Sequence, residues 1–142
     1  MRLSVWCSEE MPFADPSIIE RETDSHPEVR GLSPAVFDAS ICAIWGVRPM
    51  TKKENLPVKS DIPVLLMSGE YDNETPPKWA KGMLKNLSNS YHLIFKGWKH
   101  TLTTNWEDPC AMEAANAFFN NPHQIPDPDC FKEIETPFFK IK

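Results

Sequence analysis

The chain has 142 residues, enough for one ordinary domain with its own core, and its composition of 41% hydrophobic and 25% charged residues is typical of a globular protein. Twenty acidic against fifteen basic residues give a net charge of −5, and no basic patch is present, which argues against binding to nucleic acid or to an anionic membrane. No apolar run approaches the roughly 20 residues of a membrane-spanning helix.

In the N-terminal region, residues 1–60, a short helix is predicted to begin at Asp15-Pro16 and to run to Glu22. Asp15 supplies its N-cap and Pro16 its first-turn proline. The apolar segment Leu3–Cys7 before it is predicted to be a strand rather than a signal peptide. A strand that begins so close to residue 1 suggests a segment of a longer chain.

A second helix begins in the same way at Ser33-Pro34. Residues 46–61 after it are predicted to form a loop. The apolar residues of this helix recur near the helical period and predict one buried face; they are Val36, Phe37, Ile41 and Ile44.

The clearest pattern, within residues 61–120, is a strand–helix–strand unit. Ile62–Met67 is a continuous apolar run, typical of a parallel strand that is buried on both faces. Thr75-Pro76 provides an N-cap and a first-turn proline for the following helix, and Tyr91–Phe95 is the next strand. The apolar stripe of the helix consists of Trp79, Met83, Leu84 and Leu87. This order predicts a right-handed crossover between parallel strands.

A loop at Lys96–His100 leaves the second strand, and Asp108-Pro109 starts a last helix. Its predicted apolar side consists of Met112, Ala115, Phe118 and Phe119. A proline-rich tail, residues 121–142, completes a single segment, 1–142, of fold class α/β: a mostly parallel sheet with flanking helices.

The four cysteines contain no CxxC pair, which argues against a zinc ribbon. Cys110 and Cys130 flank one helical segment and are favoured as one disulfide, with Cys7–Cys42 as the other. Four buried free thiols are the alternative. Disulfides would favour a periplasmic or secreted protein, whereas free thiols would favour the cytoplasm.

Asp72 and His100 each follow one of the two predicted strands of the crossover unit. Because the carboxyl ends of parallel strands meet at one edge of a sheet, we expect these two side chains to lie close together. A carboxylate that accepts the Nδ1–H of a histidine fixes its tautomer and stabilises the imidazolium, so the histidine can act as a general base for a serine.

The main alternative for Asp72 is an ordinary turn residue. Glu70 and Glu74 are alternative acids because they are close in sequence. Glu9 and Glu10 are expected to lie in a solvated loop, although carboxylates also hold substrate amines. Three further histidines are expected to be structural or exposed: His26, His92 and His123. Two tryptophans that flank His100 are expected to pack, or else to line a pocket: Trp98 and Trp106.

The stretch Pro63–Asp72 (PVLLMSGEYD), followed by Thr75-Pro76-Pro77, resembles the acid-bearing strand and turn of α/β-hydrolases, and Gly97 and His100 resemble their histidine loop. More narrowly, the chain resembles the C-terminal region of tripeptidyl and prolyl aminopeptidase-like serine hydrolases. Further likenesses are Cys7-Ser8-Glu9, Cys42–Trp45 and the helix after His100 with its flanking Cys110 and Cys130. The resemblance implies that Asp72 is the triad acid and His100 the general base. No metal or other cofactor is implied.

The family's nucleophile lies in a Gly-x-Ser-x-Gly turn, which this chain lacks: its glycines occur at 31, 46, 69, 82 and 97, and no two are four apart. We therefore expect the chain alone to be inactive. Its expected partner is the N-terminal remainder of a parent hydrolase, and the expected substrate of the complete enzyme is a small peptide or ester. The uncovered sheet edge also predicts self-association. The rival interpretations are a catalytically inert binding module on a hydrolase-derived scaffold and a zinc-binding domain.

Overall fold

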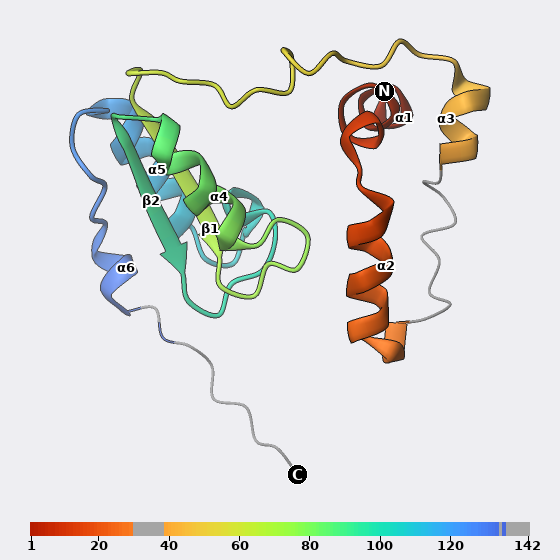
Figure 1. Ribbon diagram of the computed structural model, residues 1–142. Coiled ribbons are helices and arrows are strands. Elements are labelled where there is room, and N and C mark those ends of the chain that lie inside the picture. The colour runs from red at the N-terminus through yellow and green to blue at the C-terminus, as the bar shows by residue number, and fades with distance from the viewer. Residues whose placement is uncertain (30–38, 134, 136–142) are drawn as a thin grey trace. The chain divides into compact units, whose positions relative to one another are not determined.

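The computed structural model describes residues 1–29, 39–133 and 135 (Figure 1). The chain divides into two compact units, Met1–Leu56 and Pro57–Lys142. None of the described helices is long and apolar enough to cross a membrane.

The N-terminal unit begins with helical turns and not with the expected strand. Helix α1 spans Arg2–Val5 and continues as a π-helix over Trp6–Glu10, so the predicted strand Leu3–Cys7 is wrong. No strand lies in the described part of this unit to pair with such a segment, and a helix satisfies the backbone groups locally. The helix end is held by a disulfide between Cys7 and Cys42.

Helix α2, Pro16–Ser25, confirms the helix predicted from Asp15-Pro16 and extends three residues beyond Glu22. The Asp15 carboxylate accepts hydrogen bonds from the backbone N–H of Ser17 at 2.9 Å and from its hydroxyl at 2.7 Å. This is the N-cap expected from the sequence.

Helix α3 is described over Ala39–Trp45; its predicted start at Ser33-Pro34, and with it Val36 and Phe37, lies outside the described residues. Cys42 is bonded to Cys7, and the Trp45 indole donates a hydrogen bond to Ser4 Oγ at 3.1 Å. Ile41 is half-buried, whereas Ile44 is 85% exposed, because it projects away from the face that carries Cys42 and Trp45. The burial predicted for Ile44 is therefore wrong. The predicted loop 46–61 contains no helix or strand apart from an isolated bridge at its end, Ser60 to Leu87.

The second unit is built on a strand–helix–strand crossover, as predicted. Strand β1, Val64–Gly69, pairs in parallel with β2, Ser90–Phe95, and the register aligns Val64 with Ser90 and Gly69 with Phe95. Helix α4, Pro77–Met83, and a 3₁₀ turn, Leu84–Asn86, connect the strands. The N-cap of α4 is Pro76 and not Thr75, whose hydroxyl is used elsewhere.

Helix α5, Cys110–Asn120, covers one face of the sheet, and α4 lies in front of the sheet in Figure 1. The N-cap of α5 is Pro109, and Asp108 just before it accepts a hydrogen bond from the Cys110 N–H at 3.0 Å. The core is formed by six buried residues, Leu93, Phe95, Leu102, Cys110, Ala111 and Ala114. A short helix, α6, spans Asp129–Glu133, and its Phe131 packs against this core.

Two predicted apolar stripes are only partly buried. On α5, Ala115 and Phe118 are buried as expected, but Met112 and Phe119 are exposed, because the stripe that faces the sheet is 111, 114, 115 and 118. On α4 and the turn after it, Leu87 is buried and Leu84 half-buried, but Trp79 and Met83 are at least half exposed. The described sheet is two strands wide, so it covers less of α4 than the sequence pattern predicts. For the same reason the apolar residues of β1 are half-buried and not buried on both faces.

Candidate active site

The loops after β1 and β2 leave the same edge of the sheet, because Gly69 and Phe95, the last residues of the two strands, are paired in parallel. Asp72 lies three residues beyond Gly69, and His100 lies five residues beyond Phe95. The crossover therefore brings two polar side chains from distant positions in the sequence to one place, the carboxyl edge where reactive groups gather in α/β sheets.

Asp72 and His100 are in direct contact. Asp72 Oδ2 accepts a hydrogen bond from His100 Nδ1 at 2.9 Å, and Asp72 is 7% exposed. Its other oxygen, Oδ1, accepts the backbone N–H groups of Glu74 at 2.9 Å and of Thr75 at 2.8 Å. Oδ2 also accepts the Thr75 hydroxyl at 2.7 Å. Every one of these bonds holds the carboxylate in a single orientation toward the imidazole.

The same bonds decide the charge of Asp72. Burial acts to raise the pKa of this carboxyl, but the backbone N–H of Thr75, the His100 ring, the Thr75 hydroxyl and the Glu74 N–H together lower that pKa well below its usual range. Asp72 is therefore an anion at any physiological pH, and its negative charge is always available to the imidazole.

His100 is affected in the opposite sense. The hydrogen bond to Asp72 raises the pKa of His100, burial opposes this, and the charges of Asp72 and Glu74 raise the pKa further. The ring is about one-third exposed, with a side-chain relative exposure of 36%. Its second nitrogen, Nε2, is 3.8 Å from the carboxylate of Glu74. His100 thus has one nitrogen anchored by the buried Asp72 and a second, Nε2, beside the largely exposed Glu74 carboxylate.

Thr75 fixes the tautomer of His100, a role that the sequence analysis did not assign. Its single hydroxyl hydrogen is donated to Asp72, so its oxygen, 3.1 Å from His100 Nδ1, can only accept from that nitrogen. Both neighbours of Nδ1 therefore require the proton there, and Nε2 is left with the lone pair that a general base needs. The Asp-x-x-Thr spacing carries this signal, but Thr75-Pro76 also has the pattern of a helix start, which predicts a cap at Thr75 instead.

The loop that carries His100 rests directly on the end of β1. The Tyr71 N–H donates to the Trp98 carbonyl at 2.9 Å, and a Cβ on Gly69 would lie 2.5 Å from that carbonyl oxygen. Only glycine permits this approach. Gly97 allows the turn itself through a positive φ of +71°. Thr101, directly after His100, also has a positive φ, of +61°, which is a strained conformation for a β-branched residue.

The two alternative acids occupy different places. The Glu70 carboxylate accepts the backbone N–H of Gly97 at 2.8 Å, so it closes the histidine loop from the β1 side. Glu74 is largely exposed and approaches His100 at Nε2, not at the buried nitrogen. Asp72 is the carboxylate bonded to Nδ1.

A cavity of about 230 Å³ lies beside the pair and is open to solvent. It is lined by Met67, Asp72, Thr75, His100, Thr101, Leu102 and Thr103. A second depression of about 450 Å³ also reaches His100 and includes Trp98, whereas Trp106 is 92% exposed. His100 therefore lines two solvent-open hollows, and a reacting group can reach it from either.

The remaining candidates lie apart from this constellation. His92 Nε2 is hydrogen-bonded to the buried Ser68 hydroxyl at 3.0 Å, and burial lowers the pKa of His92, as does the nearby Lys81. His26 pairs with Glu28 at 3.1 Å. His123 is exposed, as are Glu9 and Glu10 on the π-helix.

The cysteines form the two favoured disulfides, Cys7–Cys42 and Cys110–Cys130, with Cα atoms 5.2 and 5.7 Å apart. Within the residues that the structure describes, no group of three or more histidine, cysteine or carboxylate side chains could hold a metal ion. The zinc-binding interpretation has no support there.

Comparison with known families identifies the scaffold. A family model of the α/β-hydrolase type, described as TAP-like protein, matches residues 32–130, more than half of the chain. The chain belongs to the TAP-like family of α/β-hydrolases. No curated protein and no solved structure matches it significantly. The match confirms the resemblance and the α/β fold class, and its range includes Asp72 and His100.

Proposed function

We propose that this TAP-like chain supplies the acid and the general base of a Ser-His-Asp triad, with Asp72 and His100 in these roles and the serine outside the 142 residues. The observation that carries the proposal is the 2.9 Å hydrogen bond between His100 Nδ1 and the buried carboxylate of Asp72. A His–carboxylate pair of this geometry is the conserved half of triads on unrelated folds.

The reaction would be hydrolysis of a small peptide or ester. His100 Nε2 takes the proton of the serine hydroxyl as the oxygen attacks the carbonyl carbon, and the imidazolium formed is stabilised by ionised Asp72. The imidazolium then gives this proton to the leaving amine or alcohol, and an acyl-enzyme remains. Water, activated by the same nitrogen, releases the acid. Neither step requires a metal or an organic cofactor.

The serine must come from elsewhere because the chain has no Gly-x-Ser-x-Gly turn. The partner that we propose is the N-terminal remainder of the parent hydrolase, docked against the sheet. Val64 N–H donates to the Asn89 carbonyl at 2.9 Å, so the peptide groups of Leu65 and Met67 point to the opposite edge of β1. Among the described residues no strand pairs with that edge, and in isolation the same edge would promote self-association.

The two disulfides favour a location in an oxidising compartment, either the periplasm or the outside of the cell. Alkylation of the unreduced protein, followed by mass spectrometry, tests this directly. Four unmodified cysteines are expected, and four alkylated ones would favour the cytoplasm.

The function is tested by complementation. The purified chain should show no turnover of p-nitrophenyl esters or peptide anilides above background. The segment encoded directly upstream in the same reading frame should contain the Gly-x-Ser-x-Gly turn, and its serine should react with a fluorophosphonate probe only in complex with this chain.

The labelling should be lost with His100→Ala and strongly reduced with Asp72→Asn, whereas His123→Ala, an exposed histidine in the same unit, serves as the control. Labelling that survives His100→Ala would contradict the proposed role. If no such upstream segment exists and no activity can be assembled, the inert binding module becomes the better interpretation.

A further inference from the structure

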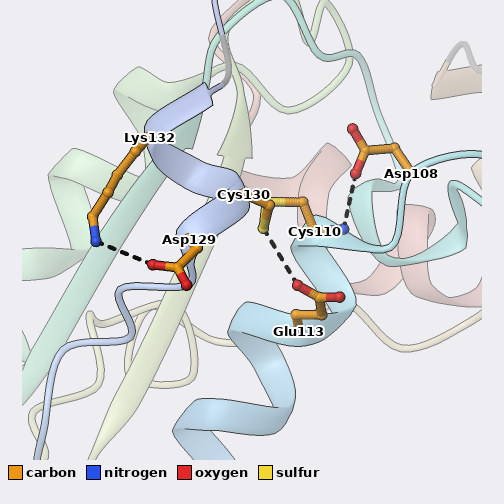
Figure 2. Close-up of a disulfide and its surroundings, with 6 residues drawn as sticks. All are labelled: Asp108, Cys110, Glu113, Asp129, Cys130 and Lys132. Atoms are coloured by element: carbon orange, nitrogen blue, oxygen red, sulfur yellow. Dashed lines mark hydrogen bonds and ion pairs between the residues drawn. A yellow bond between two sulfur atoms is a disulfide. The ribbon is translucent and has the colours of Figure 1, made fainter.

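Helix α6 is joined by a disulfide to helix α5, which covers one face of the sheet. Cys110, the first residue of α5, is 1% exposed, and its disulfide partner Cys130 lies on α6. Figure 2 shows the two sides of this link: Asp108 accepts a hydrogen bond from the Cys110 N–H, and the Glu113 carboxylate lies 3.5 Å from Cys130 Sγ. The intervening residues 121–128 contain no helix or strand, so the disulfide adds a direct covalent link between α5 and α6 to the irregular chain that joins them.

The anchored helix places an aromatic ring against the end of β2. The ring of Phe131, next to Cys130, meets the ring of Phe95 edge to face, with centroids 5.1 Å apart. Phe95 is fully buried and is the last residue of β2. Its ring also lies 5.2 Å from the ring of Trp98. Phe131 therefore supports a buried ring that in turn supports the histidine loop.

Phe95 and Trp98 hold the loop by backbone bonds as well. The Phe95 carbonyl accepts the N–H groups of Glu70 at 2.9 Å and of Trp98 at 3.3 Å, and the Trp98 carbonyl accepts from Tyr71. On the far side of His100, Leu102 is buried in the same cluster as Cys110. Both ends of the segment that carries His100 are thus fixed to the core on which Phe131 packs.

We propose that Phe131, held in place by the Cys110–Cys130 disulfide, is a positioning residue for His100, and that reduction of this disulfide loosens the Asp72–His100 pair. A dithiol reductant transfers two electrons and two protons, so that the disulfide becomes two thiols and the reductant becomes a disulfide. Freed from Cys110, α6 is held to the core by the packing of Cys130 and Phe131 and by the chain that leads to it from α5. The catalytic consequence rests on the function proposed above, but the effect on the acid–histidine pair does not.

The test uses the 142-residue chain and follows His100 by NMR, through the downfield resonance of its Nδ1 proton and through its titration. Phe131→Ala and the double variant Cys110→Ser/Cys130→Ser should both broaden or remove the Nδ1 resonance and move the pKa of His100 down toward its ordinary value of 6.5. Phe131→Leu, which keeps an apolar side chain, should restore most of the signal.

The second disulfide provides the matched control, because it lies in the other unit. Cys7→Ser/Cys42→Ser should leave the His100 resonance unchanged. Dithiothreitol should broaden the His100 resonance of this control variant, which retains the Cys110–Cys130 disulfide. It should cause no further change of that resonance in Cys110→Ser/Cys130→Ser. Because Phe131→Ala retains both disulfides, it tests the proposal even if the Cys110→Ser/Cys130→Ser variant unfolds.

An unchanged Nδ1 resonance and pKa in folded Phe131→Ala would overturn the proposal while leaving the function intact. In the assembled hydrolase, Phe131→Ala should lower kcat about tenfold with little change in KM, since a misplaced base affects the chemical step. A changed resonance together with full activity of His100→Ala would instead refute the function and leave the support by Phe131 standing.

Discussion

Gly69→Ala should displace the histidine loop without altering any polar group of the site. The φ of Gly69 is not in the left-handed region, so the effect is steric and not conformational. The added Cβ would lie 2.5 Å from the Trp98 carbonyl oxygen and 2.8 Å from its carbon, and closer still to the Lys99 carbonyl oxygen. All of these atoms are backbone, so no side-chain rotation relieves the contact.

The magnitude follows from these distances. Ordinary contact begins at 3.4 Å, so the Trp98 carbonyl must retreat by roughly 1 Å, with His100 only two residues further along. Overpacking of this kind costs about 1–3 kcal/mol of unfolding free energy. A 1 Å misplacement of a catalytic group costs on the order of a hundredfold in rate. We therefore expect moderate destabilisation of the chain and a much larger loss of serine labelling in the assembled enzyme.

Gly82→Ala is the matched control, because a Cβ at Gly82 on α4 meets nothing within 4 Å. Alanine at this helical position should stabilise the chain by up to about 1 kcal/mol and leave labelling unchanged. Urea unfolding of both variants gives the free energies, and the Nδ1 resonance of His100 reports the geometry. The steric reasoning is wrong if Gly69→Ala retains the wild-type resonance and unfolds at the wild-type urea concentration.

Two further predictions concern the polar groups of the pair. The pKa of His100 is raised in the folded state, so its contribution to stability is complete below pH 6.5 and is lost as the pH rises through the folded-state pKa. The pKa of Asp72 is lowered in the folded state, so its contribution is complete above pH 3.8 and is lost as the pH falls through the folded-state pKa. The urea midpoint should therefore be highest between about pH 4 and 6.5, and a decline above pH 6.5 that persists in His100→Gln would contradict this assignment. Thr75→Val removes the hydroxyl shared by Asp72 and His100 and should lower labelling of the assembled enzyme about tenfold. Thr75→Ser keeps the hydroxyl and should keep labelling within about twofold of the wild type. Equal labelling of the valine and serine variants would show that the hydroxyl is not needed.

Local patterns predicted the elements that bring the pair together. The signals are short-range: a continuous apolar run, a proline at a helix start and a second apolar run. They predicted β1, α4 and β2 in this order, with the two strands parallel. The proximity of Asp72 and His100 followed from that order alone, since consecutive parallel strands end at one edge.

The same patterns misjudged burial at positions where it depends on how many strands lie beside a segment. Trp79 and Met83 carry the spacing of a buried stripe, yet both are at least half exposed, because the described sheet offers α4 only two strands. Leu3–Cys7 has the composition of a strand but forms helical turns, since strands need a partner whereas helices satisfy their own backbone.

The sequence by itself therefore determined the α/β crossover, the order of acid before histidine, and the lack of a nucleophile turn. Only the tertiary structure decided what holds the pair in register: the Thr75 hydroxyl between the two side chains, the Glu70 carboxylate on the Gly97 N–H, and the missing Cβ of Gly69 beneath Trp98. These contacts join residues three to about thirty positions apart through directions and distances of single atoms. Periodicity and spacing carry no such information, because it arises only when two strand ends and their loops are packed together.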